Sequence, residues 1–185
     1  MPKDSSKKML GADRRSQLLE WLEMSVRPLT GSSLASRASV SRQVIVQDMS
    51  LLKAQGHPIL ATSQGYIIIQ NKNTDQTVQK RVAVSHPSDP ASTLKELYLI
   101  VDHGGKIVDV SVEHPVYGDI TASLMIESRI DADRFIKNMK NTNASMLSEL
   151  TAGVHLHTIE IPSHAQFDVL LEALQSHSYL ISEDN

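Results

Sequence analysis

The sequence predicts an α+β protein in which an N-terminal winged helix-turn-helix is followed by a ferredoxin-like α/β sandwich. The first observation is that three segments with helical periodicity precede two short β-prone runs within the first 70 residues. The second is that strand and helix patterns then alternate in the order βαββαβαβ. The third is the charge: residues 1–72 carry 10 Lys and Arg against 5 Asp and Glu, whereas residues 73–185 carry 8 against 16. A basic first half has nucleic acid as its default partner.

Three helices are expected in the first half. The first covers residues 14–24 and stops before Pro28, because proline disfavours the helical conformation of the residue that precedes it. The second is short, and Thr30 is its predicted N-cap. The third begins after the N-cap Ser41 and ends at Gly56.

Two β-prone runs follow, at residues 58–61 and 66–69, and a four-residue loop separates them. They predict a β-hairpin, and three helices followed by a hairpin make a winged helix-turn-helix. A polar stretch then leads into the second half and is interpreted as a linker. The predicted domain boundaries are residues 1–70 for the winged helix-turn-helix, 71–80 for the linker and 81–185 for the second domain.

The second half is predicted to form a sheet covered by helices. An Asp-Pro pair at residues 89 and 90 supplies an N-cap and a proline at the first helical position. Hydrophobic periodicity and turn residues place the remaining elements. Strands are expected at residues 81–84, 107–112, 120–126, 154–161 and 179–181, and helices at residues 90–101, 131–139 and 163–175.

The composition excludes several classes of protein. The chain has no Cys, which excludes a disulfide scaffold, Cys-ligated zinc, iron–sulfur clusters and thiol catalysis. Hydrophobic residues make up 41 %, too many for a disordered chain. No apolar run approaches the ~20 residues that span a bilayer, and the N-terminus has no apolar signal region. We therefore expect a cytoplasmic protein without a membrane partner.

The third predicted helix has the pattern of a DNA recognition helix. Ile45, Met49 and Leu52 recur at i, i+4 and i+7 and are expected to face the core. The opposite face falls in the first two turns, where a recognition helix meets base edges. The residues on that face are Arg42, Gln43, Val46 and Gln47.

These residue types suit the reading of base pairs in double-stranded operator DNA. Arginine pairs with guanine, glutamine pairs with adenine, and Val46 suits contact with a thymine methyl group. Ser41 and the helix N-terminus are expected to bind a phosphate, while Arg37 and Lys53 contact the DNA backbone. The alternative is a protein-interaction module, because helix-turn-helix units also serve that purpose and every amphipathic helix has a polar face.

A histidine pattern in the second half predicts a metal site. His155 and His157 lie two residues apart on a predicted strand, so both imidazoles share one face. His86 at the end of the first strand, and Glu96 in the helix after it, are the natural third and fourth ligands. Without cysteine, such a site must use imidazole and carboxylate. The alternative is a set of half-buried, hydrogen-bonded histidines that bind no metal.

Three motifs in the second half carry a family resemblance. Residues 105–110 (GKIVDV), 112–118 (VEHPVYG) and 153–159 (GVHLHTI) resemble the three-histidine domain of niacin-responsive transcriptional repressors of Gram-positive bacteria. Residues 40–48 (VSRQVIVQD) resemble the winged helix of bacterial regulators related to biotin-ligase repressors. The resemblance covers nearly the whole chain, from about residue 14 to 181.

The resemblance implies a homodimer that represses genes for NAD synthesis and niacin uptake, with nicotinic acid as corepressor. It also implies a divalent transition metal in the second domain, and zinc and nickel come first among the candidates. Carried over to this sequence, the three histidines and one glutamate that hold the metal are His86, Glu96, His155 and His157.

Nicotinic acid offers a pyridine nitrogen and a carboxylate, so we expect it to bind at or beside the metal. His114 and Tyr117 are the predicted polar contacts, because they lie in a glycine-bounded loop between central strands. One alternative is a metal-dependent enzyme that acts on a small pyridine-type substrate and carries a regulatory winged helix. No nucleophile motif, phosphate loop or paired carboxylates accompany the histidines, so the chain is not expected to be an enzyme. A third possibility is a structural module whose histidines hold its core together.

Overall fold

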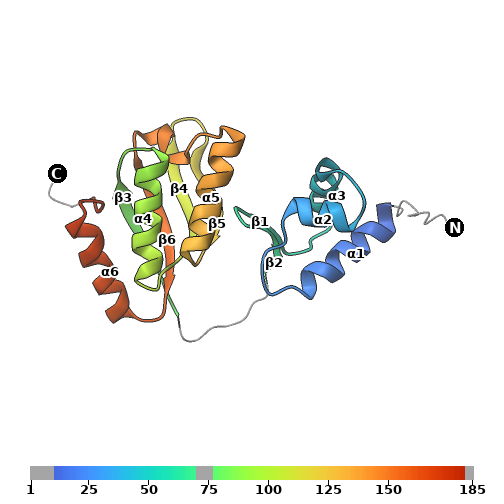
Figure 1. Ribbon diagram of the computed structural model, residues 1–185, viewed down its shortest axis with the longest axis horizontal. Coiled ribbons are helices and arrows are strands. Elements are labelled where there is room, and N and C mark those ends of the chain that lie inside the picture. The colour runs from blue at the N-terminus through green and yellow to red at the C-terminus, as the bar shows by residue number, and fades with distance from the viewer. Residues whose placement is uncertain (1–10, 70–76, 182–185) are drawn as a thin grey trace. The chain divides into compact units, whose positions relative to one another are not determined.

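A computed structural model describes residues 11–69 and 77–181 of the 185-residue chain. The chain divides into two compact units, residues 1–72 and 73–185, and each is described by itself (Figure 1). The predicted fold class, a winged helix-turn-helix followed by an α+β sandwich, is confirmed. Within the described ranges, no helix is long and apolar enough to cross a membrane.

The first unit consists of three helices and a hairpin. Its elements are α1 (Gly11–Glu23), α2 (Gly31–Arg37), α3 (Arg42–Ala54), β1 (Ile59–Thr62) and β2 (Gly65–Ile68). Both predicted N-caps are confirmed: the Thr30 hydroxyl accepts from the Ser33 N–H, and the Ser41 hydroxyl accepts from the Val44 N–H. These bonds satisfy helix N–H groups that have no partner within the helix, and so fix where α2 and α3 begin.

The hairpin turn is shorter than predicted. Only residues 63 and 64 connect the strands, because Thr62 pairs directly with Gly65. Gly65 has φ +131°, and a Cβ there would lie 2.3 Å from the Leu29 carbonyl oxygen, so only glycine fits. The close approach lets Leu29 pair with Tyr66, which ties the hairpin to the segment before α2.

The second unit is a four-stranded antiparallel sheet with helices packed against it (Figure 1). The sheet order is β3-β6-β4-β5, so the last strand lies between the first two. The strands are β3 (Val78–Ser85), β4 (Lys106–His114), β5 (Gly118–Ile126) and β6 (Val154–Ile161). The helices are α4 (Pro90–Asp102), α5 (Arg129–Thr142), the 3-10 helix η1 (Leu147–Thr151) and α6 (His164–Ser176).

Two predicted elements of this unit need correction. Residues 71–76 of the predicted linker lie outside the described residues, but its end is already strand: β3 begins at Val78. Gln79 and Lys80 point outward from an edge strand, so their polarity is compatible with pairing to β6. The predicted strand at 179–181 is a single bridge between Leu180 and Val84, too short to form a ladder.

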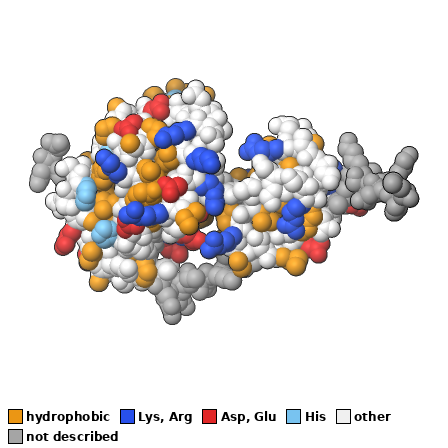
Figure 2. Space-filling view, in the orientation of Figure 1, with side chains coloured by type: hydrophobic (Ala, Val, Ile, Leu, Met, Phe, Trp, Pro, Cys, Tyr) orange, Lys and Arg blue, Asp and Glu red, His pale blue; other side chains and the backbone are white. Residues whose placement is uncertain are grey.

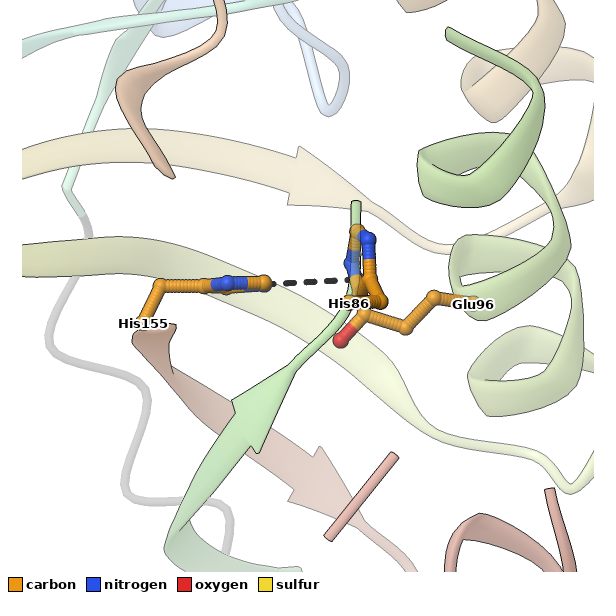
Figure 3. Close-up of side chains that lie close together, drawn as sticks. All are labelled: His86, Glu96 and His155. Atoms are coloured by element: carbon orange, nitrogen blue, oxygen red, sulfur yellow. Dashed lines mark hydrogen bonds and ion pairs between the residues drawn. The ribbon is translucent and has the colours of Figure 1, made fainter. Parts of the chain in front are cut away.

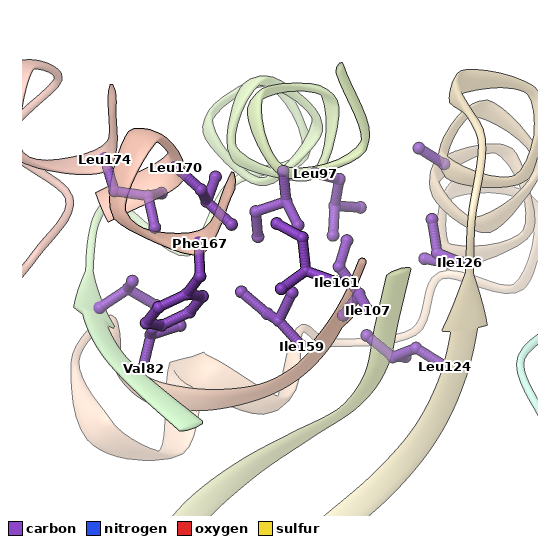
Figure 4. Packing of buried hydrophobic residues seen from close by; sticks show 13 residues of the cluster. Val82, Leu97, Ile107, Leu124, Ile126, Ile159, Ile161, Phe167, Leu170 and Leu174 are labelled. Carbon is purple, nitrogen blue, oxygen red and sulfur yellow. The ribbon is translucent and has the colours of Figure 1, made fainter. Parts of the chain in front are cut away.

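Alternate residues of the strands form the core beneath the helices (Figure 4). On β6, Ile159 and Ile161 are buried against this core, and the same face continues backward to His157 and His155. A strand whose inner face changes from isoleucine to histidine therefore carries polar groups into a buried environment. This change of residue type marks the candidate site.

Candidate functional site

The candidate site lies where β6 meets the connection from β3 to α4. His86 directly follows β3, and the Asp89 side chain caps α4 by accepting from two backbone N–H groups, which starts the helix that carries Glu96. The antiparallel pairing of β3 with β6 brings His86 beside His155. The structure thus brings together the four residues that the sequence predicts, and all are nearly inaccessible: His86 is 7 %, Glu96 0 %, His155 4 % and His157 2 % exposed.

Three imidazoles surround the Glu96 carboxylate, and Figure 3 shows two of them, His86 and His155. Glu96 Oε2 lies 2.8 Å from His86 Nε2 and 3.4 Å from His155 Nε2. Glu96 Oε1 lies 3.4 Å from His157 Nε2. Ligand atoms of His86, Glu96 and His155 all lie within 4.8 Å of one another, a spacing that can hold one metal ion. On the face drawn in Figure 2, few histidines reach the surface, in accord with the burial of this cluster.

The other ring nitrogen of each histidine is held by the backbone. In each ring Nδ1 lies 2.8 Å from a carbonyl oxygen, and the acceptors for His86, His155 and His157 are Pro87, Gly153 and Asp109. A carbonyl cannot donate, so Nδ1 carries the proton and donates. This assignment directs Nε2 at Glu96 in all three rings, which is how metal-binding histidines are oriented.

The electrostatics of the cluster favour a charged carboxylate. Burial opposes the charge of Glu96, but the imidazoles of His157, His155 and His86 outweigh it and hold the pKa of the carboxyl well below its ordinary value. Burial likewise opposes protonation of His86 and His157, but Glu96 raises the pKa of both imidazoles. The negative charge of Glu96 therefore favours protons on the surrounding imidazoles, and a bound metal would displace those protons.

Two atoms of the cluster lack a hydrogen bond. Among residues 11–69 and 77–181, Glu96 Oε1 and His157 Nε2 are buried without a hydrogen-bond partner. Leaving a buried polar atom unsatisfied costs about 1–3 kcal/mol. A divalent cation would take both lone pairs, and three imidazoles with one carboxylate suit a transition metal. The residues therefore fit the predicted metal.

Two local features of the backbone position the histidines. The β4 strand bulges between Ile107 and Asp109, which leaves the Asp109 carbonyl free to accept from His157 Nδ1. The Asp109 carboxylate accepts from the Thr158 N–H at 3.2 Å. At the start of β6, Gly153 has φ +101°, and a Cβ there would lie 2.2 Å from the His86 carbonyl oxygen.

A cavity of about 240 Å³ adjoins the cluster. His86, Glu96, His155 and His157 all contribute to one side of it. Most of the remaining wall is apolar, and its residues include Val110, Leu124, Phe135 and Met139. A ring-sized apolar chamber beside a polar cluster is the usual composition of a small-molecule site.

The predicted ligand contacts His114 and Tyr117 do not line this cavity. They lie in the turn between β4 and β5, where His114 Nδ1 accepts from the N–H groups of Val116 and Tyr117. Their rings pack against each other at 4.9 Å, and Tyr117 is 77 % exposed. The histidine thus stabilises its own turn, and the contact of this pair with a ligand stays a prediction that the cavity lining does not support.

The predicted DNA-reading face has the expected exposure. Ile45, Met49 and Leu52 are buried in the core of the first unit. The residues predicted to meet DNA lie outside that core: Ser41, Arg42, Gln43 and Gln47 are exposed, and Val46 is half-buried. Arg37 is exposed too, with its guanidinium 4.2 Å from the centre of the Trp21 ring, which restricts where it can reach.

Thr93 and Asp109 are the residues of the site that the sequence did not single out. Thr93 lines the cavity from α4, three residues before Glu96, and that helical spacing could have indicated it. Asp109 contributes its carbonyl to His157 because β4 bulges there, and the residue pattern does not predict that bulge.

Both units of the chain match known domain families. Residues 79–183 match the 3H domain, and residues 14–67 match an HTH domain. The transcription repressor NadR of Bacillus subtilis (strain 168) is 49 % identical over 177 residues, which cover 95 % of this chain and 97 % of that protein. The probable transcription repressor NiaR of Thermotoga maritima is 39 % identical over 176 residues, which cover 95 % and 98 %.

Both relatives are named as transcription repressors, in accord with the prediction that the chain is not an enzyme. The crystal structure of PH0061 aligns with 78 % of this chain and 89 % of its own at 18 % identity. Its TM-score is 0.25, too low to support an argument.

Proposed function

The chain belongs to the family of 3H-domain transcription repressors that includes NadR and NiaR, and on that premise we propose that it is a DNA-binding repressor controlled by nicotinic acid. The first unit reads operator DNA, and the second binds a metal and the acid. The observation that carries the sensing role is the buried cluster, because it gathers three imidazoles around one carboxylate and leaves Glu96 Oε1 and His157 Nε2, 3.4 Å apart, without a hydrogen bond within the described chain.

The proposed metal is a divalent transition ion, zinc or nickel, held by His86, Glu96, His155 and His157. When bound, it supplies a Lewis-acid centre for the nitrogen or carboxylate of a small ligand. Three backbone carbonyls orient the imidazoles, Glu96 provides the negative charge, and apolar residues of the cavity exclude water around a ring. Nicotinic acid, a flat ring with one carboxylate, suits a chamber of this size and composition.

The proposed DNA contacts come from α3. Arg42, Gln43, Val46 and Gln47 read base edges in the major groove. Ser41 and Arg37 hold the phosphate backbone and set the register of the helix on the duplex. Their exposure, opposite the buried face of α3, supports this assignment.

The proposed regulation is a shift between arrangements of a homodimer. Two recognition helices must lie about 34 Å apart to meet successive turns of DNA. Nicotinic acid favours that spacing only if it binds the DNA-competent arrangement more tightly. Acting in the cytoplasm, the dimer represses genes for NAD synthesis and niacin uptake.

Operator affinity tests this proposal. Binding of the full chain to operator DNA is measured at fixed salt with zinc alone, with zinc and nicotinate, and with zinc and nicotinamide. We expect nicotinate to increase the affinity and chelation to abolish the increase. An affinity that nicotinate leaves unchanged would reject the corepressor role.

A further inference from the structure

We propose that Thr93 is a specificity-determining residue of the cavity, whose hydroxyl donates a hydrogen bond to the carboxylate of a small ring acid. The proposal rests on the function proposed above and assigns a ligand contact to a residue outside the metal-binding cluster. Within residues 11–69 and 77–181, the buried side-chain atoms without a hydrogen-bond partner are Thr93 Oγ1, Glu96 Oε1 and His157 Nε2. All three residues line the same cavity.

The position of Thr93 on α4 directs it to the same space as the cluster. It precedes Glu96 by three residues, so the two side chains share one helix face. A helical threonine commonly bonds back to the carbonyl four residues earlier. Here the Asp89 carbonyl accepts from the Thr93 backbone N–H at 3.0 Å, and the hydroxyl makes no hydrogen bond to the described chain. A ligand would therefore displace no hydrogen bond of the described chain in accepting from this hydroxyl.

A metal does not account for this hydroxyl. Glu96 Oε1 and His157 Nε2 are natural ligands, because a carboxylate and an imidazole both offer lone pairs to a cation. A neutral threonine hydroxyl is a weak ligand beside them, and its strength is as a donor. Filling the metal site would thus satisfy two of the three atoms and leave Thr93 for a second occupant.

The composition of the cavity indicates what that occupant is. Its volume of about 240 Å³ and its walls of Val110, Leu124 and Phe135 suit an apolar ring. The charge of Glu96 offsets only half of a divalent cation, so the polar end of the cavity attracts an anion. A carboxylate there would receive a charge-assisted hydrogen bond from Thr93, stronger than a neutral one.

The test is calorimetric titration of nicotinate into the zinc-loaded full chain. Thr93→Val removes the hydroxyl and keeps the shape, while Thr93→Ser keeps the hydroxyl. Thr142→Val makes the same change on α5, where the hydroxyl bonds to its own helix and does not line the cavity. We expect Thr93→Val to weaken nicotinate binding on the order of tenfold or more. Thr93→Ser should stay within about threefold, Thr142→Val should match the wild type, and all four proteins should bind zinc equally.

Three results would overturn the proposal. Equal nicotinate affinity of Thr93→Val and wild type would mean that only water satisfies the hydroxyl. Equal losses in Thr93→Val and Thr93→Ser would mean that shape matters and the hydroxyl does not. A loss of zinc affinity in Thr93→Val would make Thr93 part of the metal site. A zinc-loaded wild type that binds no nicotinate refutes the proposed corepressor itself, a failure visible before any variant is compared.

Discussion

Among the described residues, each unit of the chain buries one carboxylate, and the two are stabilised in different ways. Asp48 of α3 is 2 % exposed and is held by Arg14 at 2.6 Å and Arg15 at 3.5 Å. Glu96 of α4 is 0 % exposed and is surrounded by imidazoles, with one oxygen lacking a hydrogen bond. Arginine stays charged at every physiological pH, whereas imidazole can lose its proton. The partners of Asp48 therefore keep their charge, whereas the imidazoles around Glu96 could give up protons to a metal.

The partners of the two carboxylates show how a charge that is buried to stabilise the fold differs from one that is buried at a binding site. Asp48 joins α1 to the recognition helix through cations that belong to the chain. The partners of Glu96 are oriented by backbone carbonyls so that each Nε2 points inward. A buried carboxylate therefore indicates a binding site only when its partners are ionisable near neutral pH and some of its hydrogen-bonding capacity is unused.

The largest expected effect is on the stability of the first unit. Asp48→Ala should lower the free energy of unfolding by about 3 kcal/mol, because it removes the hydrogen bonds that a buried carboxylate accepts from Arg14 and Arg15. Urea denaturation measures this loss, with zinc affinity expected to stay unchanged. Glu23→Ala, at an exposed position on α1, is the control and should change stability by less than about 0.5 kcal/mol. An equally small effect of Asp48→Ala would show that the ion pair does not stabilise the unit.

The next effect is on metal binding. Glu96→Gln keeps the size of the side chain and removes the only negative charge of the cluster, so zinc affinity should fall by about 100-fold or more, beyond the range of outer-shell changes. Competition with a chelator of known affinity measures it. Glu160→Gln on β6, outside the cavity, should bind zinc like the wild type. If Glu96→Gln bound zinc as tightly as the wild type, the carboxylate would have no part in the site.

A smaller loss of zinc affinity is expected when a residue that supports the cluster without belonging to it is changed. Asp109→Ala removes the acceptor for the Thr158 N–H and loosens the bulge that presents a carbonyl to His157. Zinc affinity should fall by about 10–100-fold, as for other outer-shell changes. Asp109→Asn keeps an acceptor oxygen and should retain most of the affinity. Unchanged zinc binding by Asp109→Ala would show that the bulge holds His157 without help from this side chain.

Zinc binding by the Glu96 cluster is also expected to depend on pH. Since Glu96 raises the pKa of His86 and His157, protons compete with a metal for these rings. Zinc affinity should be full above the raised pKa values and decline below them, by about tenfold per pH unit for each proton displaced. The pKa of Arg14 is raised by its hydrogen bond to Asp48, so the guanidinium stays charged. Zinc affinity that stays constant between pH 8 and pH 6 would contradict the displacement of protons.

Much of the fold follows from local patterns. The caps Thr30 and Ser41 and the limits of β6 are confirmed, because each depends on a few adjacent residues. The convergence of His86, Glu96 and His155 could also be anticipated, since a strand, the helix after it and a neighbouring strand meet in a βαβ unit.

The remaining features depend on tertiary structure. The bulge at Asp109 results from how the strands meet, and no residue pattern encodes it. Helical spacing from Glu96 could place Thr93 at the cavity, but only the packing around α4 shows that its hydroxyl makes no hydrogen bond within the described chain. A glycine-bounded loop near central strands suggests that His114 is a binding residue, but its ring bonds to the backbone of its own turn, a contact that depends on the turn geometry. The loop follows β4 directly in the sequence, but His114 and Tyr117 do not line the cavity.

Whether the Glu96 cluster holds a metal is tested by zinc titration of the metal-stripped wild-type chain, followed by the NMR signals of its histidine rings. We expect one zinc per chain, proton release on binding, and shifts confined to His86, His155 and His157. Failure to bind zinc, or binding that leaves these three rings unchanged, would contradict it.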